Sequence, residues 1–63
     1  MALNTQPNIE RPDDFYQALI EAHAGLSEQE SAALNARLIL LLANQVGDLA
    51  TLTEAIAAAK AAG

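Results

Sequence analysis

The sequence contains no cysteine and no tryptophan, and its aromatic residues are a single Phe and a single Tyr. Without cysteine, neither a disulfide nor a thiolate-bound zinc ion can stabilise the chain, and a thiol nucleophile is excluded. Phe15 and Tyr16 are adjacent and too few to form a stacking platform for single-stranded nucleic acid. A reducing compartment is compatible with this composition, and we expect a cytoplasmic protein.

Positive charge is also scarce. Arg11, Arg37 and Lys60 are the three permanent cations, against eight carboxylates, so the net charge is −5 at pH 7. Binding to phosphate backbones or anionic lipid requires clustered Lys and Arg. We therefore expect no nucleic-acid partner and no attachment to a membrane surface.

The longest apolar run is LILLLA, residues 38–43, bracketed by Arg37 and Asn44. A membrane-spanning helix needs about 20 predominantly apolar residues, so this run is too short to span. The first ten residues, MALNTQPNIE, have neither the positive charge nor the apolar stretch of a secretory signal. The sequence therefore predicts no membrane segment and no signal peptide.

Apolar residues make up 52% of the 63 residues and are mostly Ala and Leu, a composition that favours helices. The apolar periodicity predicts an all-α chain of three helices, at about 12–24, 27–46 and 48–61, with the central one the longest. Residues 1–11 are predicted to form an extended or disordered arm. Residues 12–63 are predicted to form a single helical domain.

Local signals mark the ends of these helices. Pro12 suits a first helical turn, and Gly25 is the expected stop of the first helix. Ser27 to Glu30 forms a capping box, in which the serine hydroxyl and the glutamate carboxylate each accept from a free backbone N–H. Gly47 should end the central helix and Asp48 should cap the third, although a second capping box at 51–54 would start that helix one turn later.

The central helix is apolar round most of its circumference. A surface helix usually shows an apolar stripe a little over 100° wide, whereas here only the strip of Glu30, Arg37 and Asn44 is consistently polar. Two short, alanine-rich neighbours can cover about two sides of such a helix, so the sequence predicts a helical-bundle homodimer. The predicted interface residues are Leu34, Leu38, Ile39, Leu41, Leu42 and Val46. Arg37 and Asn44 are candidate contacts to a protein partner.

A catalytic constellation is not evident. His23 lies near the end of the first helix, where an imidazolium favours the negative end of the helix dipole. Most carboxylates fall in first helical turns, where capping and the dipole account for them. We expect no catalytic residue, no metal and no cofactor. The alternative is a small enzyme or ligand-binding protein whose site forms between subunits from Tyr16, His23 and nearby carboxylates.

Three stretches carry a family resemblance: DDFY at 13–16, GLS at 25–27 and LNARLILLLANQVGD at 34–48. On these residues the chain resembles a family of short bacterial proteins known as a domain of unknown function. The resemblance implies a compact helical protein, with no activity or ligand assigned to any position. The leading hypothesis from the sequence is a non-enzymatic oligomerisation or interaction module, or an accessory subunit of another protein.

Overall fold

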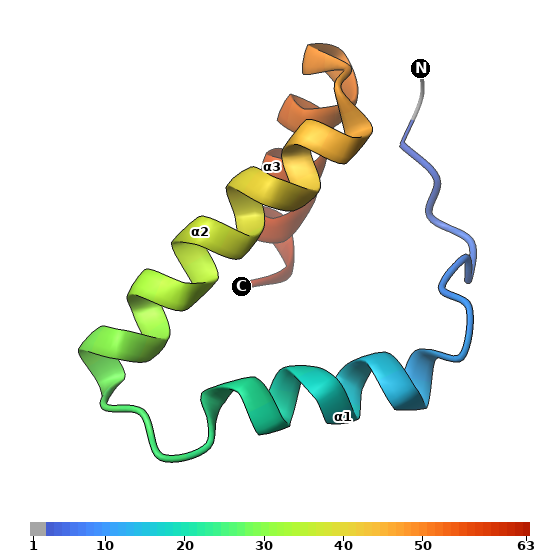
Figure 1. Ribbon diagram of the computed structural model, residues 1–63. Coiled ribbons are helices and arrows are strands. Elements are labelled where there is room, and N and C mark those ends of the chain that lie inside the picture. The colour runs from blue at the N-terminus through green and yellow to red at the C-terminus, as the bar shows by residue number, and fades with distance from the viewer. Residues whose placement is uncertain (1–2) are drawn as a thin grey trace.

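The computed structural model describes residues 3–63 and contains three α-helices and no strand in that part of the chain. Helix α1 spans Pro12–His23, α2 spans Glu28–Val46 and α3 spans Leu49–Ala62 (Figure 1). The prediction of an all-α chain with a long central helix is confirmed.

Helix α1 begins after a residue in an unusual conformation. Pro12 occupies the first turn, and Asp13 and Asp14 lie beside it at the positive end of the helix dipole. The preceding residue, Arg11, is left-handed with φ 48° and ψ 65°, and its carbonyl accepts from the N–H groups of Asp14 (3.1 Å) and Phe15 (3.2 Å). A left-handed residue with a side chain costs about 1–2 kcal/mol. The side-chain pair of Arg11 and Asp14, at 3.9 Å and largely exposed, offsets little of this.

A tight turn joins α1 to α2. The helix ends at His23, one residue before the predicted end, because Ala24 is extended at φ −59° and ψ 129°. Gly25 follows with φ +78°, and Leu26 donates its N–H to the carbonyl of His23 at 3.2 Å. These are the features of a type II turn, which requires positive φ at its third residue. Gly25 therefore serves the turn after the helix rather than the helical stop predicted for it.

The ends of α2 match the predicted signals. The Ser27 hydroxyl accepts from the N–H of Glu30 at 3.1 Å, and the Glu30 carboxylate accepts from the N–H of Ser27 at 2.9 Å. The bond from the Ser27 backbone, followed by the Ser27 side chain, lowers the pKa of Glu30. At the other end, Gly47 has φ +78° and donates its N–H to Ala43 at 2.8 Å. The capping box and the glycine stop are thus both present.

Asp48 caps the N-terminus of α3. Its carboxylate accepts from the hydroxyl of Thr51 at 2.6 Å and from the N–H of Thr51 at 2.9 Å. These two bonds, the side-chain one first, lower the pKa of Asp48. The helix therefore starts at Leu49, and the alternative start one turn later is wrong.

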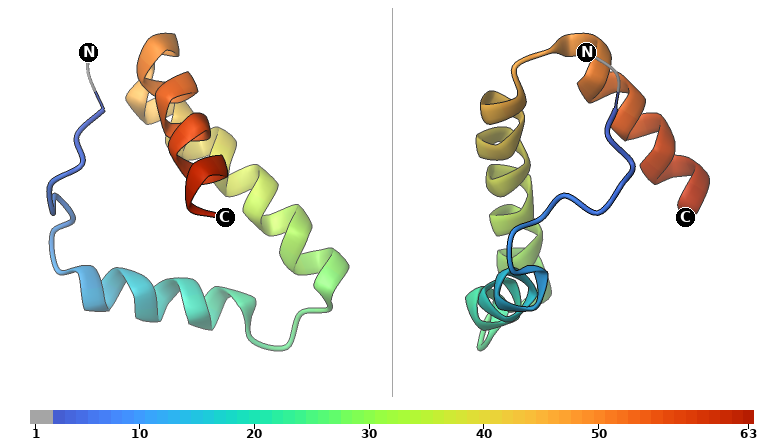
Figure 2. Two further views of the ribbon diagram at one scale, coloured as in Figure 1. Left: turned by 180° about the vertical axis from the view of Figure 1, so that it is seen from behind. Right: turned by 90° about the vertical axis from the view of Figure 1, so that its right-hand side faces the viewer.

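The three helices form an open arrangement rather than a closed bundle. Helix α3 turns back beside α2, whereas α1 diverges from α2 after the turn (Figures 1 and 2). The segment 3–11 runs from α1 towards α3, where the N–H of Leu3 donates to the Glu54 carboxylate at 3.1 Å. Residues 1 and 2 of the predicted arm lie outside the described residues.

This arrangement leaves the apolar side chains uncovered. Within residues 3–63, no apolar side chain is buried, and the chain exposes 5446 Å². A compact monomer of 6.6 kDa exposes about 3,900 Å². The radius of gyration is 13.2 Å, against about 11 Å for a compact chain of this length. Helices α1 and α3 leave part of the circumference of α2 uncovered, since Leu40 is 71% and Ile39 64% exposed.

Ser27→Ala should lower the free energy of unfolding by about 1 kcal/mol, because it removes the acceptor for the Glu30 N–H. Urea titration followed by circular dichroism, at fixed protein concentration, measures the change. Ser31→Ala is the matched control, since it removes the same hydroxyl inside α2 and should cost at most a few tenths of a kcal/mol. Equal losses in the two variants would contradict a specific role for the cap.

Acid should destabilise the fold partly through Glu30 and Asp48. Their pKa values are lowered by folding, so the stabilisation they give is complete above the unfolded-state pKa, near 4, and is lost as the pH falls through the lowered values. The variant Glu30→Gln with Asp48→Asn should lose less stability than the wild type between about pH 5 and pH 2.5. Thermal melts in high salt, which screens the change in net charge, measure the difference. Parallel losses would show that the two caps do not carry the acid sensitivity.

Candidate functional site: an apolar groove between α1 and α2

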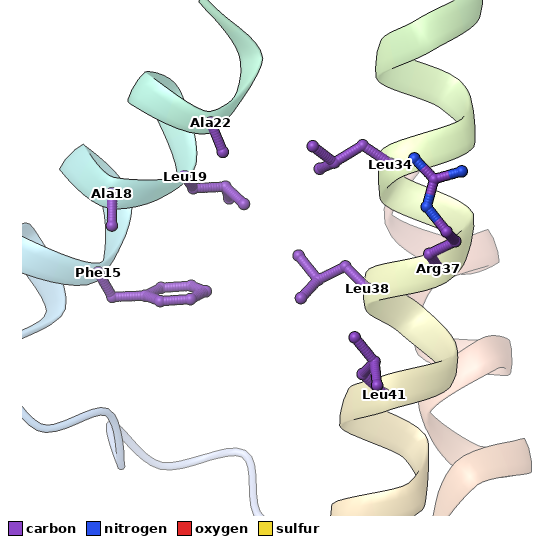
Figure 3. Close-up of a pocket in the computed structure, with 8 residues that line it drawn as sticks. All are labelled: Phe15, Ala18, Leu19, Ala22, Leu34, Arg37, Leu38 and Leu41. Carbon is purple, nitrogen blue, oxygen red and sulfur yellow. The ribbon is translucent and has the colours of Figure 1, made fainter.

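An open groove of about 360 Å³ lies between α1 and α2. Phe15 and Leu19 project from α1 towards α2, and Leu34 and Leu38 project from α2 towards α1 (Figure 3). The full lining consists of Phe15, Ala18, Leu19, Ala22, Leu34, Arg37, Leu38 and Leu41. We call this feature the α1–α2 groove.

Helical spacing places these side chains on the two walls. Phe15, Leu19 and Ala22 recur at intervals of four and three along α1, so they share one face of that helix. Leu34, Leu38 and Leu41 do the same along α2. The two apolar faces are directed at each other, but α1 diverges too far for them to close into a core, and Phe15 remains exposed.

Arg37 is the one charged residue of the lining. Its side chain is exposed and extends along α2 beside Leu34 and Leu38 (Figure 3). The groove therefore offers carbon surface with a single cation beside it. Such a lining suits an apolar occupant whose polar parts stay at the edge.

A second apolar surface lies on α2 outside the groove. Ile39, Leu42 and Val46 are 64%, 49% and 45% exposed, and none of them lines the groove. We call these three residues the α2 ridge. The six predicted interface residues thus divide equally, with Leu34, Leu38 and Leu41 in the groove and the other three on the ridge.

The α1 wall was missing from the predicted interface. The predicted interface was derived from the central helix alone, with its two neighbours expected to cover about two sides of it. Tyr16 adjoins Phe15, with ring centroids 5.9 Å apart, yet it lies towards the arm. The available signal was the length of α1, because a helix of 12 residues joined by a short turn can shield only part of a 19-residue neighbour.

The residues of the alternative site are not brought together within one chain. Tyr16 and Asp13 border a shallow hollow formed with residues 4–9 of the arm. His23 lies about two turns further along α1 and lines neither this hollow nor the groove. Among residues 3–63, no three His, Asp or Glu side chains are grouped so that they could hold a metal ion.

The part of the chain that the structure describes has no helix long and apolar enough to cross a membrane. Its features define a small all-α protein with an open apolar groove and an exposed apolar ridge. The model of the family described as "Protein of unknown function (DUF2783)" matches residues 3–61, nearly the whole chain. The chain belongs to this family, which confirms the resemblance found in the sequence. No curated protein and no solved structure matches it.

Proposed function

We propose that this protein is a non-enzymatic helical module that assembles as a homodimer through the apolar faces of α1 and α2. The observation that carries the proposal is that none of the apolar side chains within residues 3–63 is buried in a single chain. The module, residues 12–63, serves as an interaction unit or as an accessory subunit in the cytoplasm. Arg37, beside the groove, and Asn44 are both exposed in the single chain and are candidate contacts for a protein partner.

The exposed area has the size that a dimer requires. The chain exposes about 1,500 Å² more than a compact monomer of its mass. If two copies cover this excess, they bury about 3,000 Å² in total, which falls in the range of obligate homodimers. Crystal-packing and transient contacts are typically much smaller.

The lengths of the helices support the same conclusion. Isolated helices shorter than about 12–15 residues are marginal in water, and their stability in proteins comes mainly from packing an apolar face. Helix α1 has 12 residues and α3 has 14. Helix α3 has the Asp48 cap, whereas α1 follows the left-handed Arg11 and has no side-chain cap. A single chain also leaves the apolar face of α1 uncovered, so a second copy supplies the packing that α1 lacks.

Sedimentation equilibrium at micromolar concentration should give twice the 6.6 kDa mass of one chain. Refractive-index detection is needed because the protein lacks tryptophan. Leu42→Asp should shift the protein to monomers with reduced helicity, since it places a carboxylate in the interface. Gln29→Glu adds the same charge in the first turn of α2 and should leave the dimer intact. A fully helical wild-type monomer would contradict the proposal.

Added salt should strengthen the dimer. Each copy carries a net charge of −5, so the copies repel one another, and the groove and ridge contribute no carboxylate to be paired. Raising the ionic strength from about 0.01 to 0.15 M shortens the Debye length from about 30 to 8 Å and screens this repulsion. The dimer Kd, measured by sedimentation, should fall. A rise would instead indicate that ion pairs hold the subunits together.

A further inference from the structure

We propose that the α2 ridge of one copy docks into the α1–α2 groove of the second copy, and that the second copy returns the same contact. This inference rests on the proposed homodimer and adds which surfaces meet. It replaces the simpler arrangement in which the two α2 ridges pack on each other and the grooves stay open.

The ridge has the pattern of a helix that docks into a groove. Ile39, Leu42 and Val46 stand at positions i, i+3 and i+7 of α2. At 100° per residue they fall within a stripe about 60° wide. Amphipathic helices that lie in hydrophobic grooves present their anchors at this spacing. All three side chains are exposed in the single chain and so are ready to be buried.

The groove is complementary to the ridge in chemistry. Seven of its eight lining residues are Ala, Leu or Phe, so it requires an apolar occupant. No carboxylate lies on the lining or on the ridge, which lets two acidic copies meet there with the least repulsion. The one charge, Arg37, is positive and favours an approaching copy of net charge −5.

The positions of the two surfaces allow a closed pair. The ridge and the α2 wall of the groove lie on neighbouring stripes of one helix, about 100° apart. One copy can therefore insert its ridge while its groove receives the partner's ridge, which is the reciprocal contact of a two-fold dimer. The two α1–α2 pairs then form a four-helix core, and α3 stays outside it.

Cysteine cross-linking tests the arrangement, because the natural chain has no thiol. Leu19→Cys, on the α1 wall, is mixed with Ile39→Cys, Leu42→Cys or Val46→Cys in turn and treated with a short bis-maleimide. The partner variant carries a mass tag so that cross-links between different copies are identified. The matched control is Leu40→Cys, which is exposed on another face of the same helix. At least one ridge position should cross-link to Leu19→Cys tenfold more than the control.

Each outcome has a distinct meaning. If the variants are dimers and Leu19→Cys cross-links to Leu40→Cys as strongly as to any ridge position, the docking of the ridge is overturned. The proposed homodimer is unaffected by that result. Monomers at micromolar concentration would overturn the proposed function itself. Sedimentation and circular dichroism of each variant establish that it still folds and dimerises. Should Leu19→Cys fail this check, Ala22→Cys on the same wall replaces it.

Discussion

The structure depends on one constraint, which is that the apolar side chains around most of the circumference of α2 must be removed from water. Hydrophobic burial is the dominant favourable term in folding, and it must offset the loss of conformational entropy. Here a single chain satisfies its backbone hydrogen bonds within three helices but leaves Ile39, Leu41 and Leu42 facing solvent. The radius of gyration, 13.2 Å, exceeds the value of about 11 Å for a compact chain of this length, as expected when so little apolar surface is buried. The proposed assembly rests on this constraint more than on any individual contact.

The helix boundaries were predictable because they are decided by neighbours in sequence. The bonds between Ser27 and Glu30, and those between Asp48 and Thr51, join groups three residues apart, so the residue types at that spacing suffice to predict them. The type of turn at Gly25 was harder to predict than these caps. Either a helical stop or a type II turn places glycine at positive φ, and the choice depends on the extended conformation of Ala24.

The spatial arrangement was less predictable, since it depends on contacts between residues far apart in sequence. No local sequence signal predicts that the N–H of Leu3 donates to the Glu54 carboxylate, or that Arg11 takes a left-handed conformation before a proline. The groove illustrates the same limit. The sequence predicted the apolar residues of the α2 wall, but only the divergence of α1 from α2 shows that Phe15 and Leu19 remain open beside Leu38. Half of the candidate site was therefore visible in the sequence, and the α1 wall was not.

Because the ridge and the α2 wall of the groove lie on one helix, the ways in which copies could assemble are also limited. If complementary surfaces lay on opposite sides of the chain, each added copy would expose a new surface, and the contacts would propagate into a filament. In the proposed dimer the two surfaces lie on neighbouring stripes of α2, so one partner covers both at once and neither the ridge nor the groove is left to recruit a third copy. The acidic remainder of the surface adds a long-range repulsion that disfavours further addition. The proposed closure at two copies thus follows from the positions of the ridge and of the α2 wall of the groove on a single helix.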